Sequence, residues 1–151
     1  MLDNPPYTSA RIPEFGAITY VDVFFDDLDW LGMLHNSRFG ILVERAWSIY
    51  WRRQNVAVSS DWTLKENGFI LTKQFSITYD NPVPHPGRYA VHLWVERLGT
   101  SSMTYGFKLQ SLDGGTVFAH GNRTLVNLDP EAGVPTPWSE EGRSVASKLK
   151  Q

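Results

Sequence analysis

The sequence predicts a single α+β domain, in which an antiparallel sheet of about five strands wraps around one long helix. Two patterns predict it: an apolar repeat of helical period in residues 37–53, and alternation of period two in the segments after residue 68. A chain of 151 residues is of one-domain length and buries a sizeable core. We expect one domain over residues 1–151, with an irregular lead at 1–15 and a proline-containing tail at 129–151.

The first strand is expected at Ala17–Phe25, because β-branched and aromatic residues dominate it. An acidic, turn-like stretch, residues 26–32, follows. The helix comes next, with Asn36 or Ser37 suited to cap its N-terminus and with arginines in its last turn. Its apolar residues recur every three or four positions and form one stripe: Phe39, Leu42, Val43, Ala46, Trp47 and Tyr50.

Four more strands follow a polar segment, residues 54–67. Alternating apolar residues mark the first three of them: Phe69, Leu71, Phe75, Ile77 and Tyr79; Tyr89, Val91, Leu93 and Val95; Met103, Tyr105, Phe107 and Leu109. Thr116–Leu128 is expected to be the last, after a hairpin signal at 113–115. Because the connections are short, strands two to five are expected to form a meander. Residues 138–150 are compatible with a short helix.

Composition excludes several classes of protein. The chain has no cysteine, which excludes disulfides, a thiolate nucleophile and cysteine-ligated metals. A net charge of −2 without a basic run argues against a nucleic-acid partner. No signal peptide and no membrane-spanning apolar run is recognisable, so a cytoplasmic protein is expected. Four scattered histidines predict no metal site, and nothing indicates a cofactor.

Asp27 to Phe39, read as DLDWLGMLHNSRF, with Glu44 on the helix that follows, resembles the motif of the hotdog-fold acyl-CoA thioesterases. The likeness is strongest to the 4-hydroxybenzoyl-CoA thioesterase type, whose motif runs D-x-D-x-x-G-[HI]-[VL]-x-N-x-x-[YF] between the first strand and a long central helix. The order of elements agrees, and the likeness covers about residues 17–140. It implies hydrolysis of an acyl-CoA or acyl-carrier-protein thioester by a homodimer or homotetramer.

The resemblance also implies roles for particular residues. Asp29 matches the catalytic carboxylate, and the backbone N–H groups around His35, Asn36 and Ser37 match the end of the helix that binds the oxyanion. Gly32 matches the turn that lets the backbone approach the thioester.

Four further residues are expected near the substrate. Met33 stands where many relatives carry histidine. Glu44 is expected to contact substrate, or else to form a salt bridge with Arg45 or a neighbouring subunit. Arg97 and Ser101 stand at the place after the third strand where relatives carry basic residues for the nucleotide phosphates. Residues 98–101 here contain no basic residue, so the phosphates are expected to be recognised elsewhere, or the carrier is not free CoA.

Elementary chemistry agrees with these roles. Thioester hydrolysis needs a nucleophile or a base, and donors for the developing oxyanion. A carboxylate supplies the first and a helix N-terminus supplies the second. Asp29 precedes the expected helix start by about eight positions, which allows the two to converge. The alternative is that Asp29 only caps a turn, as aspartates between a strand and a helix commonly do.

Two other functions stay open from the sequence. A hotdog domain that binds an acyl thioester or a lipid without hydrolysing it has the same pattern. Asp80 and His85 imitate a hotdog hydratase signature, although they lie between two expected strands rather than before the helix. By charge alone, Lys73 and Arg123 are further candidates for a phosphate contact.

Overall fold

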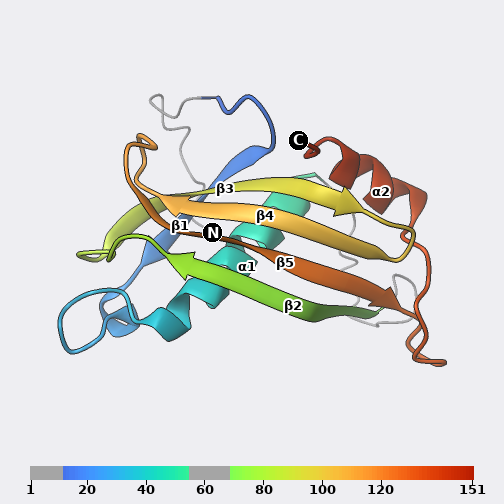
Figure 1. Ribbon diagram of the computed structural model, residues 1–151, viewed down its shortest axis with the longest axis horizontal. Helices are drawn as coiled ribbons and strands as arrows, with labels where there is room; N and C mark the ends of the chain where they lie inside the picture. Colours follow the sequence, from blue (N-terminus) through green and yellow to red (C-terminus); the bar gives the residue numbers. More distant parts are fainter. Residues whose placement is uncertain (1–11, 55–68) are drawn as a thin grey trace.

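Five antiparallel strands form one sheet, and a long helix lies across one of its faces (Figure 1). The computed structural model describes residues 12–54 and 69–151. In chain order the elements are β1 (Ala17–Val23), η1 (Phe25–Asp27), α1 (Asn36–Arg53), β2 (Phe69–Tyr79), β3 (Gly87–Leu98), β4 (Ser102–Gln110), β5 (Val117–Leu128) and α2 (Glu140–Ser147). The predicted α+β arrangement of five strands and a long helix is confirmed, and α2 adds a second helix.

The strand order is β1-β3-β4-β5-β2. The prediction of a meander is therefore confirmed for β3, β4 and β5, but it is wrong for β2, which pairs with β5 at the far edge of the sheet. The backbone explains the difference. The N–H groups of Asp80 and Asn81 both donate to Phe118 O, so the chain leaves β2 beside β5. The proline-rich segment that follows then crosses to β3 instead of closing a hairpin.

The apolar stripe of α1 faces the sheet, as its period predicted. Phe39, Leu42 and Val43 are at most 4% exposed. Trp47 stacks on Tyr105 of β4, with ring centroids 3.9 Å apart and planes 6° from parallel. This packing fixes the direction of α1, and so the place of its N-terminus, relative to the strands.

Three element ends differ from the sequence predictions. β1 ends at Val23 rather than at Phe25, because the Asp27 carboxylate accepts the N–H of Phe24 at 2.8 Å and turns the chain out of the sheet. The predicted lead, residues 1–15, lies outside the described residues except for its last four, which form no helix or strand. The polar segment 54–67 lies outside them except for its first residue.

The tail contains the short helix that its sequence allowed, as α2. Beyond it, Leu149 O accepts the N–H of Val95 at 2.9 Å, and Lys150 forms a parallel bridge with Val95. The end of the tail thus covers the part of β3 that β1 leaves unpaired.

β2 is an edge strand with large apolar side chains in contact with solvent. Ile70 is 56% exposed, Leu71 43% and Phe75 37%. An exposed apolar edge of this kind is a site for pairing with another strand. Across residues 12–54 and 69–151, no helix has the length and hydropathy needed to span a bilayer.

Candidate active site

The Asp29 carboxylate holds a tight turn between β1 and α1. Its Oδ1 atom accepts the backbone N–H of Leu31 at 2.9 Å and that of Met33 at 3.1 Å. Gly32 has φ +80°, a left-handed conformation that favours glycine, and a Cβ there would meet no atom within 4 Å. Asp29 thus caps this turn through one of its two oxygens. Its second oxygen has no hydrogen-bond partner among the described residues, so it remains available to a ligand.

His35, and not Asn36 or Ser37 as the sequence suggested, caps the N-terminus of α1. Its Nδ1 atom accepts the N–H of Ser37 at 3.1 Å and lies 2.8 Å from Ser37 Oγ. A nitrogen that accepts a hydrogen bond carries no proton, so the neutral ring is protonated at Nε2. Histidine is not a usual capping residue, which is why the sequence pointed to its neighbours.

Asp27 is a structural carboxylate beneath this turn. It is 6% exposed; its Oδ2 binds the N–H of Phe24, and its Oδ1 lies 3.8 Å from Nε of Arg38. The carbonyl of Asp27 also accepts the N–H of His35 at 2.9 Å. Asp27 therefore ties the end of β1 to the start of α1.

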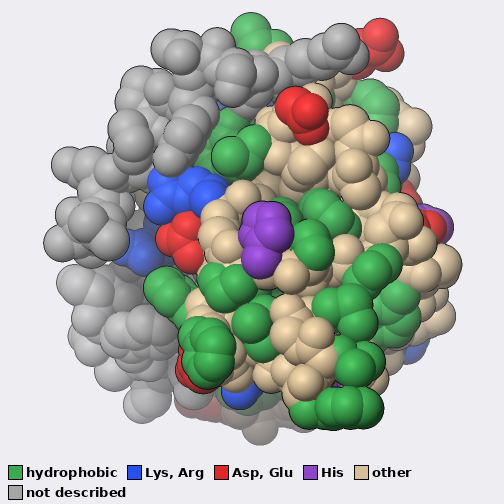
Figure 2. Space-filling view, turned by 90° about the vertical axis from the view of Figure 1, so that its left-hand side faces the viewer, with side chains coloured by type: hydrophobic (Ala, Val, Ile, Leu, Met, Phe, Trp, Pro, Cys, Tyr) green, Lys and Arg blue, Asp and Glu red, His purple; other side chains and the backbone are tan. Residues whose placement is uncertain are grey.

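One cleft of about 510 Å³ contains both the Asp29 carboxylate and the first turn of α1. It is lined by Asp29, Trp30, Met33, Leu34, His35, Asn36, Phe39, Tyr79, Asp80, Asn81 and Pro82. The spacing in the sequence predicted this convergence of a carboxylate and a helix end. Hydrophobic side chains gather on this end of the molecule (Figure 2), and Trp30 in the turn is 91% exposed.

Tyr79, at the end of β2, forms a wall of the cleft that no pattern in the sequence indicates. Its hydroxyl donates to Asn36 O at 3.4 Å, and its ring meets Phe39 edge to face at 5.0 Å. No local pattern marks this contact, because it depends on β2 lying beside β5 at the edge of the sheet. Correct strand order would have been needed to find it.

Glu44 lies about two turns along α1 from His35 and outside the cleft lining. Its side chain is 68% exposed and pairs with Arg123 at 3.7 Å, not with Arg45. Arg123 itself is 7% exposed, donates to Gly40 O at 3.2 Å and covers the ring of Phe75 at 4.6 Å. This buried arginine is thus engaged in the core instead of facing a phosphate.

Arg97 and Ser101 lie at the opposite end of the sheet from Asp29. β3 begins near the cleft at Gly87, and ten residues at ~3.3 Å per residue carry the chain roughly 33 Å away to Arg97. A single protomer therefore does not bring Arg97 or Ser101 to Asp29, although both were expected near the substrate. The sequence shows the place of these residues along the chain but not which end of the sheet they reach.

The hydratase-like pair is not formed. Asp80 Oδ2 lies 2.7 Å from Nδ1 of His120, whereas His85 Nδ1 lies 3.0 Å from Pro86 O and 3.3 Å from Tyr89 Oη. Two residues that are near in sequence thus have different partners, and the geometry gives no support to hydratase chemistry at that pair.

Comparison with known families shows which family has this arrangement of elements. The family model described as the thioesterase-like superfamily matches residues 23–149, which include the turn, α1 and the strands β2 to β5. The chain belongs to the thioesterase-like superfamily. This membership confirms the predicted enzyme class, a thioester hydrolase. No curated protein matches the sequence significantly.

Solved structures of similar proteins have the same fold. A thioesterase from Thermus thermophilus, solved with coenzyme A and zinc, is 27% identical with a TM-score of 0.72, and the match covers 92% of this chain and 98% of that one. A 1,4-dihydroxy-2-naphthoyl-CoA thioesterase from Synechocystis is 12% identical with a TM-score of 0.78, covering 88% and 98%. The PA5185 protein of Pseudomonas aeruginosa is 23% identical with a TM-score of 0.78, covering 91% and 94%.

Proposed function

We propose that this superfamily member hydrolyses the thioester of an acyl-CoA, or of an acyl group on a carrier protein, to the free acid and the thiol. One observation carries the proposal: the Asp29 carboxylate and the first turn of α1 line the same cleft. Similar structures whose names include a CoA thioester support the choice of carrier. A cytoplasmic location remains a prediction from the sequence.

The cleft contains the two groups that the reaction requires. The first turn of a helix has backbone N–H groups without intrahelical acceptors, and its positive dipole end favours an oxyanion. The thioester oxygen is proposed to lie against this turn at the N–H of Asn36, because the N–H of the neighbouring Ser37 is already held by Nδ1 of His35. Since Oδ1 of Asp29 is held by Leu31 and Met33, Oδ2 is the oxygen proposed to act.

Two balanced routes use Asp29 Oδ2. As a general base it takes a proton from water, whose oxygen bonds to the acyl carbon; the C–S bond then breaks and the proton passes to the thiolate. As a nucleophile it bonds to the acyl carbon itself and displaces the thiolate, and water hydrolyses the resulting anhydride. Either route ends with the carboxylate restored.

The remaining turn residues have supporting roles in this proposal. His35 contributes its Nε2–H to substrate or water, because Nδ1 is occupied by the helix cap. Gly32 keeps the turn open to the thioester, and Met33 offers an apolar side chain to the acyl group.

We further propose a homodimer, or a homotetramer built from such dimers, formed through the exposed edge of β2. Two β2 strands paired antiparallel about a twofold axis bring the Asp29 end of one sheet beside the opposite end of the other. We propose that this arrangement places Arg97 and Ser101 of one copy on the side of the cleft of the other. Their expected role in substrate binding then depends on the assembly, because a single protomer does not bring them to Asp29.

A panel of aliphatic and aromatic acyl-CoA thioesters, with release of free thiol as the readout, tests the proposed function. We expect turnover of at least one class by the full chain. Measurable binding without turnover across the panel would instead favour the non-catalytic acyl-binding module.

A further inference from the structure

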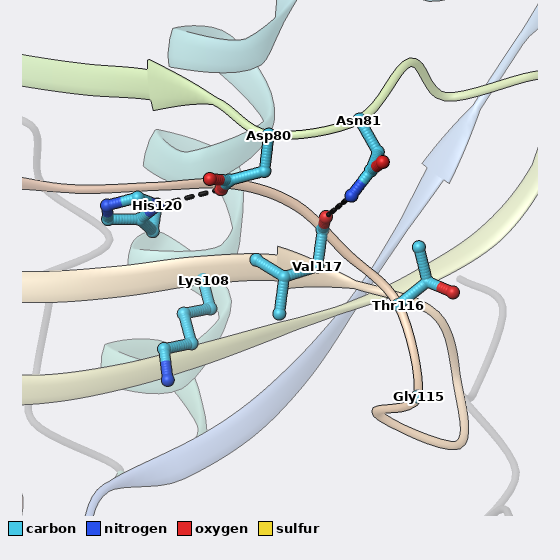
Figure 3. A pocket seen from close by; sticks show the side chains of 7 residues that line it. All are labelled: Asp80, Asn81, Lys108, Gly115, Thr116, Val117 and His120. Atoms are coloured by element: carbon cyan, nitrogen blue, oxygen red, sulfur yellow. Dashed lines mark hydrogen bonds and ion pairs between the residues drawn. The ribbon is translucent and has the colours of Figure 1, made fainter.

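A second hollow adjoins the cleft, where β2 ends and β5 begins. It has no role in the proposed hydrolysis. Its volume is about 610 Å³, and it is lined by Asp80, Asn81, Lys108, Gly115, Thr116, Val117 and His120. Asp80 and Asn81 line both hollows, so the two meet at the end of β2. Figure 3 shows Asp80, His120 and Lys108 on one side and the loop with Gly115 and Thr116 on the other.

The backbone around this second hollow is firmly held. The N–H groups of Asp80 and Asn81 donate to Phe118 O, and Asn81 Nδ2 donates to Val117 O at 2.8 Å. Asp80 Oδ2 accepts from His120 Nδ1 at 2.7 Å, which fixes the direction of the imidazole. Nδ1 is thus committed to Asp80, which leaves Nε2 as the ring nitrogen that is open to a ligand.

The charges in the hollow favour an anion. Lys108 on β4 and His120 on β5 are direct cross-strand partners. Asp80 is held by the His120 imidazole, whereas Lys108 forms no ion pair with any described residue and its Nζ lies 6.0 Å from the centroid of the Trp94 ring. The lysine thus leaves one positive charge uncompensated beside the cleft.

Other cations near this end are already committed. Arg88 forms two hydrogen bonds to the Asp22 carboxylate, at 2.8 and 3.1 Å, and Arg38 lies 3.8 Å from Asp27. The carrier half of an acyl-CoA or carrier-protein thioester bears phosphate groups, and the net charge of this chain is −2. A local cation is therefore needed where the carrier leaves the cleft.

We propose that this second hollow binds a phosphate group of the carrier, with Lys108 as the cation, Thr116 as a hydroxyl contact and His120 beside them. The inference rests on the proposed function, because the carrier's phosphate reaches the hollow only if its thioester occupies the adjoining cleft.

Calorimetric binding of CoA, phosphopantetheine and pantetheine to the full chain tests the site, since pantetheine carries no phosphate. Lys108→Met is expected to weaken CoA binding by about five- to tenfold, the size of one charge-assisted contact, and to leave pantetheine binding within about twofold. The matched control is Lys148→Met, which removes an exposed lysine next to α2, and CoA binding is expected not to change. Raised salt should weaken CoA binding less in Lys108→Met than in the parent protein.

The three ligands also identify the phosphate. If Lys108→Met weakens the binding of both CoA and phosphopantetheine, the bound phosphate is the one next to the pantetheine arm, which CoA and carrier proteins share. If Lys108→Met weakens the binding of CoA alone, the bound phosphate belongs to the nucleotide end of CoA. Unchanged CoA binding in Lys108→Met, an equal loss for pantetheine, or no binding of either phosphate ligand by the parent protein would overturn the inference. Hydrolysis of a phosphate-free acyl-pantetheine thioester by the parent protein tests the proposed function separately.

Discussion

Asp29 Oδ1 accepts the backbone N–H of Met33 at 3.1 Å, so this carboxylate both shapes the turn and faces the cleft. The two tasks use different oxygens, because Oδ1 holds the turn while Oδ2 has no partner among the described residues. An asparagine at this position keeps an oxygen that accepts the same N–H groups. Substitution to asparagine therefore removes the charge without removing the turn.

Two substitutions of His35 distinguish its effect on the stability of α1 from its effect on catalysis. His35→Ala removes the acceptor of the Ser37 N–H and should lower the free energy of unfolding by about 0.5–2 kcal/mol, whereas His35→Asn restores a capping oxygen. Both variants lack the imidazole, so we expect kcat to fall by about tenfold or more in each. Urea unfolding and steady-state kinetics measure the two effects. Equal stability losses in both variants would contradict the capping role.

Asp27 is expected to matter for folding. Asp27→Ala leaves the N–H of Phe24 without its acceptor and should cost about 1–3 kcal/mol of unfolding free energy. Asp26→Ala is a matched control, since Asp26 is an exposed carboxylate next to it. Denaturant titration of both variants measures the difference, and a similar small effect of the two substitutions would show that Asp27 does not anchor the turn.

The burial of the Tyr105 hydroxyl predicts that the folded protein loses stability in alkaline solution. Burial raises the pKa of its hydroxyl to about 12, while the unfolded side chain titrates near 10. Because the unfolded state loses its proton first, this stabilisation is complete below about pH 10 and is lost as the pH rises towards 12, by up to about 1.4 kcal/mol per unit.

Tyr105→Phe isolates this effect from other tyrosines. Among residues 12–54 and 69–151 the buried Tyr105 hydroxyl has no hydrogen-bond partner, so the substitution should change stability at pH 7 by about 1 kcal/mol or less. Unfolding measured at pH 9 and pH 11 should show a smaller decline in Tyr105→Phe than in the parent protein. An identical decline would mean that Tyr105 ionises freely in the folded state.

The edge of β2 predicts the oligomeric state. Leu71→Lys places a charge on the exposed apolar strand and should convert the proposed dimer to a monomer, because lysine on an edge strand opposes pairing. Ile12→Lys changes an equally apolar side chain that is 93% exposed elsewhere, and its mass should stay dimeric. Light scattering after size-exclusion chromatography measures the mass. A monomeric parent protein, or a dimeric Leu71→Lys variant, would contradict assembly through β2.

Local patterns predicted the elements well because they depend on neighbours in the chain. The stripe of α1 and the hairpin before β5 follow from residue spacing and turn chemistry, and both are found. The convergence of Asp29 with the start of α1 was predictable for the same reason: only a short turn separates them.

Relationships across the sheet were not predictable in this way. The position of β2 beside β5 decides that Tyr79 borders the cleft and that Asp80 meets His120. Alternation in β2 shows which residues share a face but not which strand lies alongside. The position of Arg97 was not predictable for the same reason. Its place in the motif suggested a substrate contact, but β3 carries it to the other end of the sheet.

The most direct test of the account is the turnover of Asp29→Asn beside that of Asp26→Asn, each with its best thioester substrate and with unfolding followed in parallel. We predict that Asp29→Asn lowers kcat by about 10²–10⁴-fold, the usual contribution of a catalytic acid or base, with an unchanged unfolding midpoint. Asp26→Asn should retain the parent rate. Turnover of Asp29→Asn within about tenfold of the parent protein would remove Asp29 from the mechanism.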